Sequence, residues 1–164
     1  MGVAMAFHDD LLKQAFQLAQ KESRNPKQAS LRRSVSTAYY ALFHFLIDET
    51  IANWSRVSSR AKLVRAFDHK PMKAASNRVL NRREFPFTGE DPKVVDRLRT
   101  VAKTFRQLQE KRHTADYDNT TFWTRTEALT HVKAVEQAFI TWKTIRSQRI
   151  AQDFLVSMLV KHRD

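Results

Sequence analysis

The stretch SLRRSVSTAYYALFHFLID, residues 30–48, is the longest unbroken helical pattern of the chain. At about 100° per residue, Leu31, Val35 and Leu42 fall on one stripe, which we expect to face a hydrophobic core. A second stripe, roughly opposite, carries a cation, a hydroxyl, a phenol and an imidazole: Arg33, Thr37, Tyr40 and His44. We expect this stripe to stay outside the packed core, either as the wall of a functional cleft or as an ordinary solvated helix face.

Length and composition favour one all-helical domain over residues 1–164. The chain has only two glycines and four prolines, and alternating strand patterns are scarce. A chain of 164 residues is long enough to bury a hydrophobic core. It has no cysteine, no apolar run of 18 residues and no signal-peptide pattern. We therefore expect a soluble cytoplasmic protein with no membrane segment.

Periodicity and breakers predict an all-α bundle of about five helices, with a long helix at the C-terminus. Proline disfavours helix at the residue before it, so we expect a break at Lys70–Pro71. The expected helices cover residues 7–22, 26–54, 57–69, 72–82, 92–117 and 124–161.

The last of these helices begins at a capping box, Thr124 with Glu127, and carries apolar residues to Leu159 without a glycine or proline. It is either one long helix or a helix kinked near Ser147, where the apolar stripe drifts. A helix of this length extends beyond a small bundle, so we expect its apolar end to pack on another subunit.

The apolar stripe of residues 92–117 continues onto an arginine, Arg112. A cation that is even partly buried needs a carboxylate. We therefore expect Arg112 to be largely buried and paired with Asp116, one turn further on. A tyrosine of residues 30–48 is a further candidate contact. A separate polar face of this helix carries Arg106, Glu110, His113 and Tyr117.

The formal net charge of +12 is concentrated in the middle of the chain. Residues 55–112 hold 16 basic and six acidic residues, whereas residues 1–54 hold six and five. Residues 55–83 alone hold nine basic residues and one acid. Such a segment attracts a polyanion such as RNA, although a solubilising surface has the same composition. The candidate RNA contacts are Arg60, Arg65 and Lys73.

The reactive residue types leave few catalytic options. The six histidines show no metal-ligand spacing, and the chain has no glycine-rich phosphate loop and no Gly-x-Ser-x-Gly sequence. We therefore expect no metal and no cofactor. Arg106 and His113 suffice for metal-free phosphodiester cleavage, because a guanidinium offsets charge growing on the phosphorane and an imidazole transfers a proton.

The runs AYYALFH, residues 38–44, and RHTADYD, residues 112–118, resemble the HEPN superfamily. That resemblance implies an up-and-down helical bundle, an Arg and His motif that cuts RNA, and a homodimer in which two such motifs meet. Many members are toxins paired with a nucleotidyltransferase antitoxin. By this resemblance Arg106 stabilises the phosphorane and His113 is the general acid or base. The residues that would line the same cleft are Arg33, Tyr40, His44 and Tyr117.

Two positions depart from the motif of the active members. Gln107 follows the motif arginine, where Asn, Asp or His is usual, and Ala115 stands where the antitoxin-linked branch has Tyr. A second interpretation therefore takes Arg112 as the important arginine, fixed by Asp116 and Tyr117. The alternative function is a non-catalytic module that binds RNA, a nucleotide or a protein partner through the basic middle segment.

Overall fold

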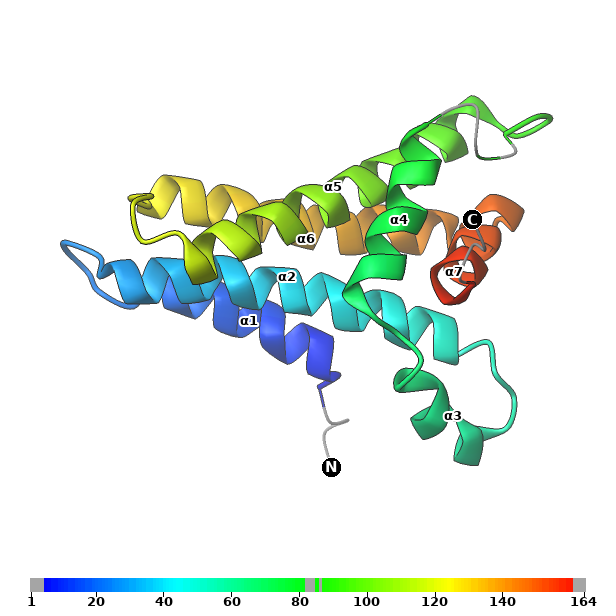
Figure 1. The fold of residues 1–164 in the computed structure, drawn as a ribbon, viewed down its shortest axis with the longest axis horizontal. Coiled ribbons are helices and arrows are strands. Elements are labelled where there is room, and N and C mark those ends of the chain that lie inside the picture. Colours follow the sequence, from blue (N-terminus) through cyan, green and yellow to red (C-terminus); the bar gives the residue numbers. More distant parts are fainter. Residues whose placement is uncertain (1–4, 82–84, 86, 161–164) are drawn as a thin grey trace. The chain divides into compact units, whose positions relative to one another are not determined.

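The computed structural model describes residues 5–81, 85 and 87–160. Over these residues it contains seven α-helices and no strand (Figure 1), so the predicted all-α fold class is confirmed. The helices are α1 (Phe7–Ala19), α2 (Gln28–Ile51), α3 (Val57–Val64), α4 (His69–Leu80), α5 (Pro92–Tyr117), α6 (Arg125–Ile145) and α7 (Arg149–Leu159).

Contacts between residues divide the chain into two compact units, each built from segments that are far apart in the sequence. Unit 1 comprises Met1–Phe45 and Gln107–Phe139, and unit 2 comprises Leu46–Arg106 and Ile140–Asp164. The three longest helices, α2, α5 and α6, each contribute one portion to unit 1 and the other to unit 2.

Unit 1 contains α1 and portions of α2, α5 and α6, and segments consecutive in the sequence run antiparallel (Figure 1). The rings of Phe45 and Phe139 stack with their centroids 4.2 Å apart. The predicted capping box is present, since the Thr124 backbone N–H donates to Glu127 Oε2 at 2.9 Å and the Glu127 N–H donates to Thr124 Oγ1 at 3.1 Å. A buried cluster of this unit comprises Ala19, Leu31, Val35, Ala115, Trp123 and Ala128.

Unit 2 contains α3, α4, α7 and the remaining portions of the long helices. The chain kinks near Ser147, as one alternative predicted: α6 ends at Ile145 and α7 begins at Arg149. The expectation that the apolar end packs on another subunit is wrong. After the kink, α7 packs against α4 of the same unit. Its buried residues are Ile150, Ala151, Phe154, Leu155 and Met158.

The predicted helix break at Lys70–Pro71 is also wrong. The chain breaks earlier, after α3, and Pro71 lies in the first turn of α4, two residues after the first helical residue, His69. Backbone N–H groups in a first helical turn have no intrahelical acceptor, so proline loses no hydrogen bond there.

Helix α2 is buried on more sides than its sequence predicted. Thr37, expected on a polar stripe outside the core, is buried, and Tyr40 and His44 are half-buried; only Arg33 of that stripe is exposed. Small side chains let a neighbouring helix come close, and the buried Ser34 Oγ donates to a backbone carbonyl of α1 at 2.7 Å. A stripe of short polar residues on α2 is therefore packed rather than solvated.

Arginine side chains close the C-terminal ends of several helices. A helix end leaves backbone carbonyls without intrahelical partners, and glycine is the usual terminator. Among the described residues the one glycine, Gly89, has a positive φ of 82° and lies in the loop before α5. Guanidinium groups bond these carbonyls instead, and their charge suits the negative end of the helix dipole. The arginines are Arg32 at α5, Arg125 at α1, Arg99 at α4 and Arg78 at α7.

Candidate functional site

The residues of the two sequence runs meet in unit 1 around Arg112. Its side chain is 14% exposed, and Nη1 lies 3.7 Å from Asp116 Oδ2. The guanidinium carbon lies 5.3 Å from the centre of the Tyr39 ring and 6.0 Å from the centre of the Tyr40 ring. A cation over an aromatic face is attracted by the ring quadrupole. We call these four residues the Arg112 cluster.

Adjacent helix positions bring the two tyrosines onto one cation. Tyr39 and Tyr40 follow each other on α2, and their rings lie edge to face with centroids 5.3 Å apart. One turn earlier, Ser36 Oγ lies 3.4 Å from Asp116 Oδ2 and donates a hydrogen bond to it. The carboxylate that pairs with Arg112 is therefore itself held by α2.

The sequence predicts that a tyrosine of residues 30–48 contacts Arg112 without saying which, and Tyr39 is the closer of the two rings. Tyr39 is fully buried and is not among the predicted site residues, whereas Tyr40, predicted to line the cleft, is half-buried. The sequence did contain a signal for these contacts. An arginine on a core stripe needs more partners than one carboxylate, and the AYY sequence at residues 38–40 provides two phenol rings. Helical periodicity alone could not tell which ring faces α5, because neighbouring positions differ by only 100°.

The guanidinium of Arg112 is held inside the unit and offers little surface to a ligand. One edge bonds Asp116, and two rings lie against it. Its Nε is buried and has no hydrogen-bond partner among the described residues. An arginine in this environment fixes α5 against α2.

The rest of RHTADYD divides into a turn residue and exposed rings. The Asp118 carboxylate accepts hydrogen bonds from the side chain and backbone N–H of Thr120 and from the Thr121 hydroxyl, which lower its pKa to about 2. His113 and Tyr117 are exposed, with ring centroids 5.0 Å apart. Only these two rings of the run are freely available to a partner.

The predicted catalytic pair falls in different units. Arg106 belongs to unit 2, where it is half-buried and lines an open hollow with Asn77, Leu80 and Asn81. His113 belongs to unit 1. The pairing of Arg106 with His113 therefore stays a prediction from their spacing on α5.

Three further residues predicted to line the cleft, Arg33, Tyr40 and His44, have different surroundings in unit 1. The His44 ring lies 4.8 Å from the Phe7 ring and 5.3 Å from the Phe43 ring, so it packs among phenyl groups. Arg33 is exposed. Tyr40 belongs to the Arg112 cluster, with its ring centre 6.0 Å from the guanidinium carbon.

The basic segment of unit 2 separates into bonded and free cations. Arg60 donates from Nε to the Trp54 carbonyl at 2.9 Å, and Lys73 is half-buried. Helix α3 has no buried residue. Two basic residues of the segment, Arg82 and Arg83, lie outside the described residues. The exposed cations are Arg56, Lys62, Arg65 and Lys70.

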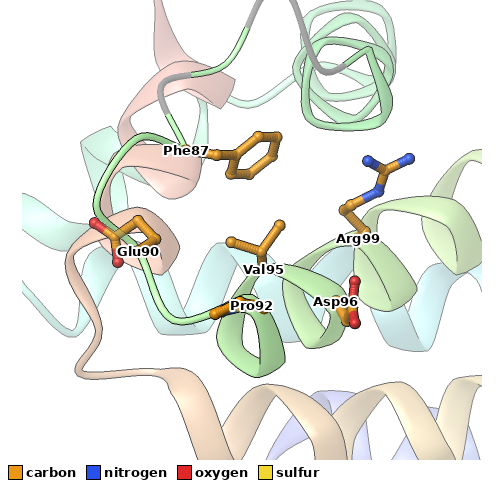
Figure 2. Close-up of a pocket in the computed structure, with 6 residues that line it drawn as sticks. All are labelled: Phe87, Glu90, Pro92, Val95, Asp96 and Arg99. Atoms are coloured by element: carbon orange, nitrogen blue, oxygen red, sulfur yellow. The ribbon is translucent and has the colours of Figure 1, made fainter.

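An open hollow of about 320 Å³ lies at the start of α5 (Figure 2). Its Glu90 carboxylate accepts a hydrogen bond from Arg149 at 2.5 Å, and its Arg99 donates to the Leu80 carbonyl at 3.3 Å. Glu90 is thus paired, whereas Arg99 Nη1 is buried and has no hydrogen-bond partner among the described residues. No predicted site residue lines the hollow. The lining residues are Phe87, Glu90, Pro92, Val95, Asp96 and Arg99.

Within the described part of the chain, no group of three His, Cys, Asp or Glu residues is placed to hold a metal ion. No described helix is both long enough and apolar enough to span a membrane. A scan against protein-family models found no match, and neither curated proteins nor solved structures gave a significant one. The HEPN resemblance therefore rests on the two runs quoted above.

Proposed function

We propose that this protein is a non-catalytic, HEPN-like module that binds RNA through the exposed cations of unit 2. One observation carries the proposal: four cations in and beside α3 are exposed and have no ion pair among the described residues. Arg112, the arginine of the second interpretation, is held by Asp116 and two tyrosines inside unit 1 and has a structural role. The cations available to RNA therefore lie elsewhere.

The RNA-binding part of the proposal rests on four exposed cations in and beside α3. Among the described residues, none of the four has an ion pair, and the nearby sequence holds a single acid, Asp68. Unpaired cations of one sign attract phosphates and release the counterions bound to them. Binding should therefore weaken with salt, with a logarithmic slope of about 0.7 for each phosphate contacted on a single strand. The four are Arg56, Lys62, Arg65 and Lys70.

The test is fluorescence anisotropy with a labelled single-stranded RNA between 50 and 200 mM salt. A variant with all four cations changed to Glu should lose more than about tenfold in affinity and have a shallower salt slope. The matched control changes four exposed cations of unit 1 to Glu, and so alters the net charge equally. These control residues are Lys13, Lys21, Arg24 and Lys133.

Two results would contradict RNA binding through unit 2. Equal losses in the variant and the control would mean that net charge alone drives association. Wild-type protein that binds no RNA at low salt would leave the four cations as a solvated surface.

The second candidate is the metal-independent RNase implied by the resemblance, and the observation in its favour is access. Both Arg106 and His113 reach solvent. If they cut RNA, the wild-type protein should cleave it in EDTA, spare DNA for want of a 2′-hydroxyl, and lose activity in Arg106→Ala and in His113→Ala. That outcome would overturn the non-catalytic part of our proposal.

A homodimer and a nucleotidyltransferase-type antitoxin remain proposals from the resemblance alone. The separate reason for expecting a second subunit, an uncovered C-terminal helix, does not hold, because α7 is buried in its own unit. Light scattering of the purified chain measures the oligomeric state directly.

A further inference from the structure

Unit 2 exposes a tryptophan beside its free cations. Trp54 is 50% exposed, whereas Trp123 is 4% and Trp142 is 0% exposed. Large aromatic side chains usually bury most of their area in a core or an interface. The exposed indole follows α2 directly and precedes α3.

The backbone that carries Trp54 is fixed from two sides. Arg60, on α3, donates to the carbonyls of Ala52 and Trp54 at 3.4 and 2.9 Å. Asn53 Nδ2 donates to Gln152 Oε1 on α7 at 2.8 Å. The backbone at Trp54 is therefore held by α3 and α7, which reduces the entropy lost when a ligand binds.

The surroundings of Trp54 combine positive charge with apolar surface. Arg56 and Val57 follow it closely and are exposed, as is Val64 at the end of α3. Helix α3 itself carries no acidic residue. Bases stack on aromatic rings while cations hold the phosphates, and this combination binds single strands without sequence preference.

We propose that Trp54 is a base-stacking platform for single-stranded RNA, with the exposed cations Arg56, Lys62, Arg65 and Lys70 on the backbone phosphates. This inference rests on the proposed RNA-binding function and names the kind of RNA and the residue that reads its bases. Duplex RNA is excluded as the preferred form, because its stacked bases do not expose a face to the indole.

An anionic membrane is the competing partner for a surface with tryptophan and cations. Membrane-surface helices bury a continuous apolar face in the lipid. Helix α3 has eight residues, and the two valines exposed on it, Val57 and Val64, lie two turns apart on one face, so its exposed apolar surface is short. The charge pattern and the single ring fit a nucleic-acid strand better.

Intrinsic fluorescence tests the inference directly, because Trp54 is the one solvent-exposed tryptophan of the three. Titration with an oligouridylate of about ten nucleotides should quench the emission in step with binding. Inorganic polyphosphate of similar charge should bind without that quenching, since it has no bases. A duplex RNA should bind more weakly than the single strand at equal salt.

Substitutions separate stacking from charge. Trp54→Ala should weaken binding of the oligouridylate at least about fivefold without changing the salt slope, and Trp54→Phe should restore part of the loss. Phe122→Ala, which removes an exposed ring from unit 1, should bind like wild type. Circular dichroism and thermal melting confirm that each variant is folded.

Each outcome distinguishes this inference from the proposed function. Unchanged RNA affinity in Trp54→Ala, with no quenching, would overturn the stacking platform and leave RNA binding intact. No RNA binding at any salt would overturn both proposals. Binding to anionic phosphatidylserine vesicles that is tighter than binding to RNA and shifts the Trp54 emission to shorter wavelength would overturn the stacking platform in favour of a membrane surface.

Discussion

The Arg112 cluster of unit 1 and the α3 surface of unit 2 both combine cations with aromatic rings, yet only one offers them to a partner. In the cluster, the guanidinium lies against two tyrosines and pairs with Asp116. On the α3 surface, defined as Trp54, Arg56, Lys62, Arg65 and Lys70, the ring and the cations are exposed. The comparison shows that residue type indicates which chemistry is possible. The contacts that a side chain already makes inside the protein decide whether it can still bind a ligand.

The largest effect should come from removing the cation of the cluster. Arg112→Ala leaves Asp116 without its partner and one buried and one half-buried ring without their cation, so the free energy of unfolding should fall by about 3 kcal/mol. Thermal and urea unfolding measure this loss. Arg65→Ala on the α3 surface is the control and should change stability by less than about 0.5 kcal/mol. Equal stability of the two variants would remove the contrast between the regions.

Arg32 allows us to compare the stability contributed by an arginine that caps a helix end with that contributed by Arg112, which pairs with a carboxylate. Its two Nη atoms donate to three backbone carbonyls around the end of α5, of Ala115, Asp118 and Thr121, at 3.0, 2.6 and 2.6 Å. Arg32→Ala should cost about 2 kcal/mol, because buried carbonyls lose their donors. Lysine at this position should rescue only part, since a single ammonium cannot span all three. Full rescue by Arg32→Lys would show that charge alone is required.

The next effect divides the basic segment itself. Arg60 donates to the carbonyls of Ala52 and Trp54 in the segment after α2, so Arg60→Ala should lower the free energy of unfolding by about 1 kcal/mol, whereas the neighbouring Arg65→Ala should not. In RNA binding the order should reverse, with the larger loss in Arg65→Ala. A double measurement of melting temperature and RNA affinity on both variants checks this. If Arg60→Ala and Arg65→Ala changed stability and RNA affinity equally, the basic segment would be one uniform charged surface.

The smallest effect should be a pH dependence that belongs to unit 1. Burial lowers the pKa of His131 below its ordinary value of 6.5, the positive charge of Lys111 lowers it further, and Glu127 partly opposes this. The folded state then binds the proton less tightly than the unfolded chain, so stability is full above pH 6.5 and falls as the pH decreases through that value. His131→Gln should reduce the fall in melting temperature between pH 7.5 and about 5.5. In the exposed control His113→Gln, the fall should match that of the wild type.

Local sequence rules predicted those features that depend on a single helix. The inward position of Arg112 followed from the apolar stripe of α5, and the cap at Thr124 followed from a glutamate three residues on. They failed where packing acts on several sides of one helix. Thr37 and His44 were placed on a polar face, yet α2 is covered on that face by side chains from other segments, and periodicity contains no information about how many neighbours a helix has.

The sequence by itself determined the all-α class, the limits of α5, the inward arginine and the concentration of charge in residues 55–83, because each depends on neighbours within a few residues. Only the tertiary structure decided that Tyr39 faces Arg112, that Arg60 is bonded while Arg65 is free, and that α4 covers α7. Tyr39 and Arg112 lie far apart in the chain, and so do α4 and α7. A side chain's partner across such distances is set by the packing of whole helices, which no local pattern encodes.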